Sequence, residues 1–331
     1  MTKRDNRRAP GLRRRELILA TLAAAATPSA FAQADRIEGP IRIVLPFGPG
    51  SGTDVYARIV AQQLGTALGV TTVIDNKPGA NGILAAEAVA RAKPDGTTLL
   101  FTTNTTHAAN PHLVKELRYD PVKDFAPISK MGNLTFFVLV PGGSPYRTMA
   151  ELVEAARKAP GTVSYGAANS FGMVSGSKLG KNAGVEFLRV PYKSSPQITT
   201  DLLGGQIQFA FVDLAAAAPL VKSGKVRALA VLADKRFASL PDVPTMTEAG
   251  FPGFNVVAWF GMFAPAGTPA PIVNRINREL VAVLNRPDLR EKGADLGIEI
   301  FGSTPRELDE YVKSQIALWA QLTADAGLKP E

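Results

Sequence analysis

Residues 41–54 read IRIVLPFGPGSGTD, an apolar run that ends in a glycine-rich turn. The run Ile41–Phe47 is typical of a buried strand, and the apolar residues of 55–64 share one face of a predicted helix. Glycine allows a tight turn and a close approach of the backbone to a ligand. The first N–H groups of a helix are unpaired, and its dipole favours an anion there. An ordinary strand-to-helix connection, with Asp54 capping its own helix, is the alternative for the same residues.

Short apolar strands and amphipathic helices alternate along the rest of the chain. This alternation predicts an α/β fold with largely parallel sheets. A length of 331 residues suggests about two domains. The strands are predicted at 41–47, 71–74, 98–102, 136–140, 163–165, 207–213 and 226–232. The clearest helices are predicted at 83–91, 149–158, 269–285 and 305–326.

The first 32 residues differ from the rest of the chain. They contain seven Lys and Arg residues against two acidic ones, with the apolar stretch Leu17–Ala26 and the small-x-small sequence Ala30–Ala32. This order is typical of a secretory signal peptide, and the stretch is shorter than the ~20 residues that span a bilayer. Arg14 and Arg15 resemble a twin-arginine export signal, with Sec export as the alternative. The sequence therefore predicts a periplasmic protein.

Charge and cysteine content exclude several classes of function. The net charge is +8 over the full chain, and residues 1–32 contribute +5 of it (7 − 2). The remaining +3 (8 − 5) is too mild to favour nucleic acid or an anionic membrane surface as a partner. The chain has no cysteine, which excludes disulfides, thiolate nucleophiles and Cys-ligated metal sites.

Polar loops follow several of the predicted strands. Residues 102–111 read TTNTTHAANP, residues 167–172 read AANSFG, and Asp213 ends a third strand ahead of the small residues 215–218. Open α/β sheets bind ligands at the carboxyl ends of their strands, although each loop taken alone is also consistent with a plain connection. The predicted ligand-binding residues are Phe47, Gly48, Gly50, Ser51, Gly52, Thr53, Thr103, Asn104, Thr105, His107, Ala168, Asn169, Ser170 and Asp213.

A nucleotide site and an enzyme are the competing interpretations. The glycines at 48, 50 and 52, with Asp75 downstream, resemble a dinucleotide-binding turn. The third glycine is misplaced, however, and the phosphate-loop Lys-Ser/Thr pair is absent. The two histidines, His107 and His112, belong to no H-E-x-x-H motif, and no G-x-S-x-G motif occurs. The sequence therefore predicts no enzyme, metal or cofactor, while a Ser-His-Asp triad assembled from distant segments stays open.

Seven motifs, taken in order, resemble the substrate-binding receptors of tripartite tricarboxylate transporters, also called Bug receptors. The resemblance covers residues 38–331, so the whole predicted mature chain takes part in it. Its motifs lie at 45–58, 76–82, 106–111, 119–127, 190–193, 240–254 and 263–269.

The resemblance implies a type II periplasmic-binding-protein fold, in which two α/β lobes close on a ligand cleft. After the signal peptide predicted at 1–32, it implies a first lobe at 33–135 and 255–331 and an inserted second lobe at 136–254. Members of this family hold carboxylates with backbone amides, small hydroxyls and waters. The implied protein is a monomer that binds a small organic carboxylate for uptake and has transient membrane transporter partners. A receptor that signals to a sensor protein and an exported α/β hydrolase are the alternatives.

One loop departs from the pattern of the family. The second-lobe loop usually reads G-S-x-x-H-L, whereas residues 168–174 read ANSFGMV, with Met173 where the histidine tends to fall. Contacts from this loop transfer least well to the present chain. Phe171 and Met173 are consistent with a more apolar pocket or with plain packing.

Overall fold

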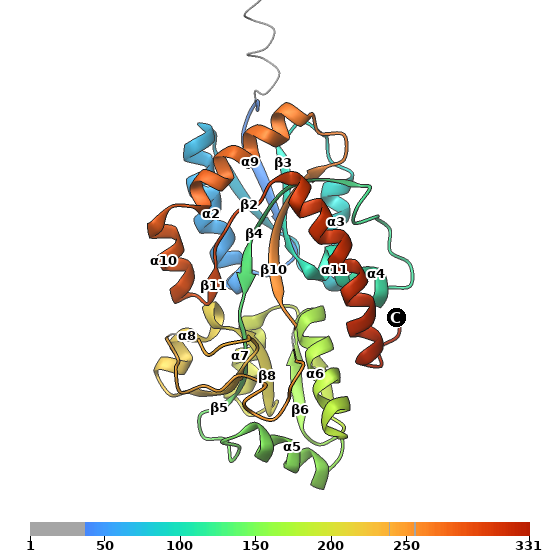
Figure 1. Cartoon of the computed structure of the whole chain (residues 1–331), viewed down its shortest axis with the longest axis vertical. Coiled ribbons are helices and arrows are strands. Elements are labelled where there is room, and N and C mark those ends of the chain that lie inside the picture. The colour runs from blue at the N-terminus through green and yellow to red at the C-terminus, as the bar shows by residue number, and fades with distance from the viewer. Residues whose placement is uncertain (1–36, 238, 255) are drawn as a thin grey trace, which may run out of the picture. The chain divides into compact units, whose positions relative to one another are not determined.

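Two β-sheets organise the part of the chain that the computed structural model describes, residues 37–237, 239–254 and 256–331. The signal peptide predicted at 1–32 lies outside these residues. Elements from both ends of the described chain build one sheet, and elements from its middle build the other (Figure 1). We call each sheet with its helices a lobe, the first being the six-stranded one.

The first lobe contains a six-stranded sheet in the order β11-β4-β10-β3-β1-β2. The strand β1 lies parallel to both β2 and β3, as the βα units at 41–103 predict. The strand β10 arrives from far along the chain and pairs antiparallel with β3 and β4. The strands are β1 (Ile41–Leu45), β2 (Thr72–Asn76), β3 (Thr98–Thr103), β4 (Phe125–Leu134), β10 (Ala258–Pro265) and β11 (Ile298–Glu299).

The second lobe contains a five-stranded sheet in the order β7-β6-β8-β5-β9. The pairs β6–β7 and β6–β8 are parallel, whereas β5 is antiparallel to both β8 and β9. The predicted α/β class is confirmed, but both sheets are mixed, not largely parallel, because β5 and β10 enter against the direction of their neighbours. The strands are β5 (Phe136–Pro141), β6 (Ser164–Ala167), β7 (Leu188–Pro191), β8 (Phe209–Asp213) and β9 (Val226–Val231).

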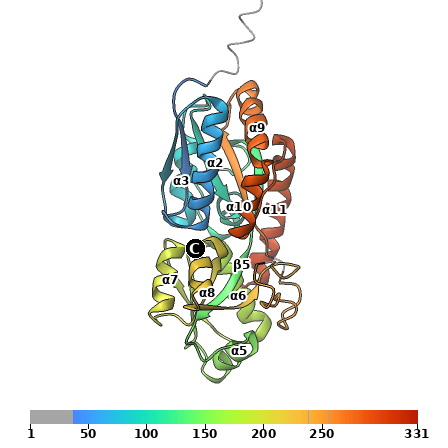
Figure 2. The same cartoon turned by 90° about the vertical axis from the view of Figure 1, so that its left-hand side faces the viewer.

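Helices cover both sheets, and all five that the sequence predicts, at 55–64, 83–91, 149–158, 269–285 and 305–326, are present. The helix α11 begins with a capping box in which Thr304 and Glu307 bond each other's backbone N–H groups. Helix α9 contacts both α2 and α11 (Figure 2). The helical elements are α2 (Gly52–Leu68), η1 (Ala80–Gly82), α3 (Ile83–Ala90), η2 (Thr105–Ala109), α4 (Asn110–Leu113), α5 (Met149–Lys158), α6 (Ser170–Ala183), α7 (Ser195–Leu203), α8 (Leu214–Lys222), α9 (Ala270–Leu284), α10 (Pro287–Asp295) and α11 (Pro305–Asp325).

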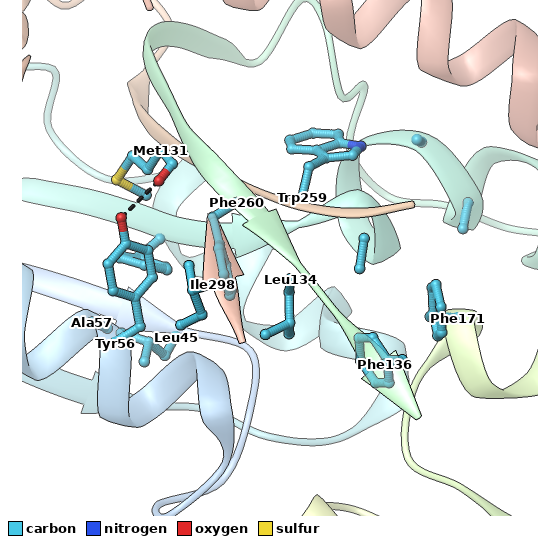
Figure 3. Close-up of a cluster of buried hydrophobic side chains, with 14 of the residues drawn as sticks. Leu45, Tyr56, Ala57, Met131, Leu134, Phe136, Phe171, Trp259, Phe260 and Ile298 are labelled. Atoms are coloured by element: carbon cyan, nitrogen blue, oxygen red, sulfur yellow. Dashed lines mark hydrogen bonds between the residues drawn. The ribbon is translucent and has the colours of Figure 1, made fainter. Parts of the chain in front are cut away.

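The strand β4 carries the chain from the first lobe into β5 of the second, with Thr135 between them (Figure 1). Its pairing with β10 is irregular at Met131 and again at Ile128, because the register skips both residues. The Met131 carbonyl accepts a hydrogen bond of 2.7 Å from the Tyr56 hydroxyl of α2 (Figure 3). Beside it, Gly132 has a φ of 132°, a conformation that favours glycine. The strand that joins the two lobes is therefore held in place by the core of the first lobe.

Candidate functional site

The glycine-rich turn leads into α2 as the sequence predicts, but Asp54 is not the N-cap. The N-cap is Ser51, whose Oγ accepts from the Asp54 N–H at 3.3 Å and donates to the Gly48 carbonyl at 2.9 Å. Asp54 reaches back to accept from the Gly50 N–H at 3.0 Å. The shorter serine side chain takes the cap because it sits one residue before the helix. The N–H groups of Gly52 and Thr53 precede that of Val55, which donates the first hydrogen bond of the helix to the Ser51 carbonyl, so they have no partner in the helix itself.

The Asp54 carboxylate stabilises this turn through several hydrogen bonds. Its carboxylate accepts from Arg58 at 3.0 Å and from Asn76 at 2.9 Å. Asn76 Nδ2 also donates to the Phe47 carbonyl at 2.9 Å, so it ties β2 to the turn. Burial would raise the pKa of Asp54, but the hydrogen bonds from Arg58, Gly50 and Asn76 outweigh it and hold that pKa below its ordinary value. The carboxylate beside the helix start is therefore ionised and neutralised by Arg58.

A second polar loop leaves the end of β3 in a π-helical turn, an irregularity that is frequent at functional sites. Asn104 is 1% exposed, and its Nδ2 has no hydrogen-bond partner among the described residues. Thr105 Oγ1 accepts a hydrogen bond of 3.0 Å from Ser170 Oγ of the second lobe. A buried amide donor with no partner costs free energy, so Asn104 is a strong candidate for binding a ligand.

His107 follows in the same turn but lies inside the first lobe. Its ring stacks on Phe263 with centroids 3.9 Å apart, and its Nδ1 is 2.9 Å from Thr106 Oγ1. Complete burial lowers the pKa of His107 to about 3, so the imidazole is neutral. It does not belong to the lining of the cavity described below.

The second lobe contributes the starts of α6 and α7. Asn169 caps α6 by accepting from the Gly172 N–H at 3.0 Å, and Phe171 follows in the first turn. The Phe171 ring stacks on Phe136 at the start of β5, with centroids 4.1 Å apart (Figure 3). Ser195 Oγ donates to Asp213 at 3.3 Å.

These segments enclose one cavity of about 20 Å³ between the two lobes. A volume of this size admits about one water molecule, so any larger ligand enters only when the lobes move apart. No Lys or Arg is among its lining residues. They are Phe47, Ser51, Thr53, Thr103, Asn104, Thr105, Leu134, Phe136, Ala168, Asn169, Phe171, Ser194, Ser195, Asp213 and Ala258.

The cavity brings together most of the residues predicted from sequence. Five of the predicted residues are not in its lining, namely Gly48, Gly50, Gly52, His107 and Ser170. Gly48 nevertheless faces the opposite lobe, where an added Cβ would lie 3.2 Å from Ser194 Cβ. The side chains of residues 215–218, which follow Asp213, are not among those that the structure describes.

Six lining residues were not predicted, and only some of them had a signal in the sequence. Ser194 and Ser195 directly follow the motif at 190–193. Phe171 lies in the loop that departs from the family pattern. The remaining three, Leu134, Phe136 and Ala258, lie where strands cross between the lobes and had none.

The described part of the chain contains neither a membrane-spanning helix nor a metal-binding cluster. None of its helices is long and apolar enough to span a membrane. No group of three or more His, Cys, Asp or Glu side chains in that part of the chain is placed to hold a metal ion.

Several known proteins are similar to this chain, some in sequence and some also in their solved structure. A UPF0065 protein of Bordetella bronchiseptica is 35% identical over 320 residues, 97% of this chain and 95% of its own. The structure of the periplasmic binding protein BugD matches with a TM-score of 0.85 and 35% identity, covering 89% of this chain and 99% of that one.

Two similar structures were solved with carboxylates. R. palustris Rpa4515 with adipate matches at a TM-score of 0.86 and 33% identity, covering 89% of this chain and 99% of its own. MatC (Rpa3494) from Rhodopseudomonas palustris with bound malate matches at 0.81 and 32%, covering 86% and 99%.

The family model described as tripartite tricarboxylate transporter family receptor matches residues 56–328. The two-lobed fold of periplasmic binding proteins that the sequence resemblance implies is confirmed by the solved structures. The matched proteins are solute-binding proteins and not enzymes, as the sequence predicts. The chain belongs to the tripartite tricarboxylate transporter receptor family.

Proposed function

We propose that this protein binds a small organic carboxylate in the cavity between its lobes and delivers it to the membrane subunits of a tripartite tricarboxylate-type transporter. The observation that carries the proposal is the cavity itself, which combines the start of α2, four first-lobe hydroxyls and the unpartnered Asn104 amide. Hydrogen bonds from such donors to a carboxylate contribute about 1.5–3 kcal/mol each. Adipate and malate in the similar structures support the same ligand class.

The proposal assigns the cavity residues as ligand contacts and the two lobes as moving parts. The proposed lobe boundaries are 135/136 and 254/255. The strands support a change of lobe after β4 and a return between β9 and β10, since β5 to β9 share one sheet and β10 belongs to the other. The protein acts as a monomer in the periplasm after export through its signal peptide, by the twin-arginine or the Sec route. Signalling to a sensor protein is the alternative use of the same binding event.

We expect carboxylates to stabilise the protein and nucleotides to leave it unchanged. A ligand present at 100 times its dissociation constant adds about 2.7 kcal/mol to the free energy of unfolding. Differential scanning fluorimetry against di- and tricarboxylates, aromatic acids, acidic amino acids, sugars and nucleotides measures this. A melting temperature raised only by sugars or nucleotides would show that the proposed ligand class is wrong.

We also expect binding to be nearly independent of basic side chains and of salt. Lys77, a basic residue in the loop after β2, pairs with Asp75 at 3.6 Å and lies outside the cavity lining. Lys77→Ala should therefore change the dissociation constant by less than about twofold, since an exposed ion pair contributes little. Raising the salt concentration from low to moderate should likewise change the dissociation constant by less than about twofold, because salt strongly screens only exposed charges. A tenfold loss in either titration would reveal an ion pair with the ligand.

A further inference from the structure

The Phe136–Phe171 stack forms the apolar side of the cavity. Phe136 is 4% and Phe171 is 2% exposed, and both line the cavity. Their centroids lie 4.1 Å apart with an angle of 26° between the planes, so the two rings are stacked on each other. They come from different elements, β5 and α6. Leu134, at the end of β4, also lines the cavity (Figure 3).

Hydrogen-bonding side chains line the cavity from both lobes. The first lobe supplies Ser51, Thr53, Thr103, Asn104 and Thr105 to the lining. The second lobe supplies Asn169, Ser194, Ser195 and Asp213. The hydroxyl hydrogens of Ser51 and Ser195 are already donated, to the Gly48 carbonyl and to Asp213. Among the lining residues, the buried donor without a described partner is Asn104 Nδ2 of the first lobe, which favours placing the ligand carboxylate there and the rest of the ligand against the aromatic rings.

Phe171 also occupies the loop in which this chain departs from the pattern of its family. The cap formed by Asn169 sets the first turn of α6 and with it the direction of Phe171. Its neighbour Met173 is buried in the same helix but does not line the cavity. Phe171 is thus the residue of this loop whose side chain can distinguish one ligand body from another.

We infer that the Phe136–Phe171 stack makes the site selective for carboxylates with an apolar body, such as aryl or alkyl monocarboxylic acids, over short hydroxy- and dicarboxylic acids. The inference rests on the proposed function and narrows its ligand class. Burying apolar surface against the rings is favourable, and aromatic rings add a preference for flat ligands. A hydroxyl or second carboxylate placed against the rings loses its hydration without gaining a partner.

Isothermal titration calorimetry with benzoate, hexanoate, malate and succinate tests this on the mature chain. The wild-type protein should bind the better of the two monocarboxylates at least about tenfold more tightly than either diacid, a difference of about 1.4 kcal/mol. Phe171→Ala should reduce this ratio about tenfold, mainly by weakening the monocarboxylates. Phe171→Leu should keep part of the preference for hexanoate because it keeps an apolar surface.

Met173→Ala is the matched control. It also shortens a buried apolar side chain of α6, so it should lower the melting temperature but keep the wild-type ratio. Equal or tighter binding of the diacids by the wild type would overturn the inference and leave the proposed function standing. So would a Phe171→Ala variant that weakens all four acids equally. If no carboxylate binds in this assay or in the wider melting screen, the proposed function fails and the inference fails with it.

Discussion

Asn104→Ala should weaken carboxylate binding by about 10- to 150-fold while leaving the fold intact. The range corresponds to the loss of one charge-assisted hydrogen bond of about 1.5–3 kcal/mol. Because Asn104 Nδ2 has no partner among the described residues, its removal breaks no hydrogen bond of that donor to the protein. The free energy of unfolding without ligand should therefore change by less than about 1 kcal/mol. Calorimetric titration and urea unfolding of the same preparation measure both quantities.

Asn110 provides a matched control in the same segment. It is also buried, but its Nδ2 donates to the Asn81 carbonyl and to the Tyr119 hydroxyl, both at 3.0 Å. Asn110→Ala should lower stability by about 1–3 kcal/mol, since it leaves buried groups unpaired, and should change affinity little. The reverse result, with Asn104→Ala destabilising and binding normally, would make Asn104 a structural residue.

Gly132→Ala should destabilise the protein by about 3 kcal/mol and lower its melting temperature by about 6–12 °C. The φ of 132° is unfavourable for alanine. An added Cβ would also lie 2.2 Å from the Glu299 carbonyl oxygen, which is backbone and moves only with β11. Both effects act on the strand that carries the chain into the second lobe. Thermal unfolding monitored by circular dichroism is the measurement.

Gly143→Ala serves as the control for Gly132. Gly143 does not have a positive φ, and nothing lies within 4 Å of the position of its added Cβ. The same substitution there should be neutral or slightly stabilising, because alanine restricts the unfolded chain. A melting temperature that falls equally in both variants would show that backbone strain at Gly132 is not the cause of the destabilisation.

The parts of the site that the sequence predicts are those that depend on local pattern. Ser51, Asn104 and Asn169 each follow a short apolar strand and precede a helical turn, and this pattern is readable within about ten residues. Because such loops lie at the carboxyl ends of strands, their residues meet in the cleft. Their role as ligand contacts stays a prediction.

The parts that the sequence does not reveal depend on partners far along the chain. The strand β4 contains Pro127 and Gly132, which weaken a strand pattern. Pro127 is tolerated because β11 pairs only with residues 133–134 of β4. At Pro127 one of the two edges of β4 therefore has no partner strand. Phe136 and Leu134 reach the cavity only because β4 runs on into the second sheet, and no local pattern encodes that path.

The sheet order of the first lobe also constrains the order in which the chain folds. The strand β4 pairs only with β10 and β11, so after Leu134 has been synthesised it has no neighbour until residue 258 follows. The five strands of the second lobe are all made in that interval and pair among themselves. As the chain is synthesised from its N-terminus, the inserted lobe can therefore form first, while the edge of β3 that β10 will cover stays exposed. Non-local pairing of this kind slows folding. The first lobe is complete only after β10, β11 and the last helices of the chain have been synthesised.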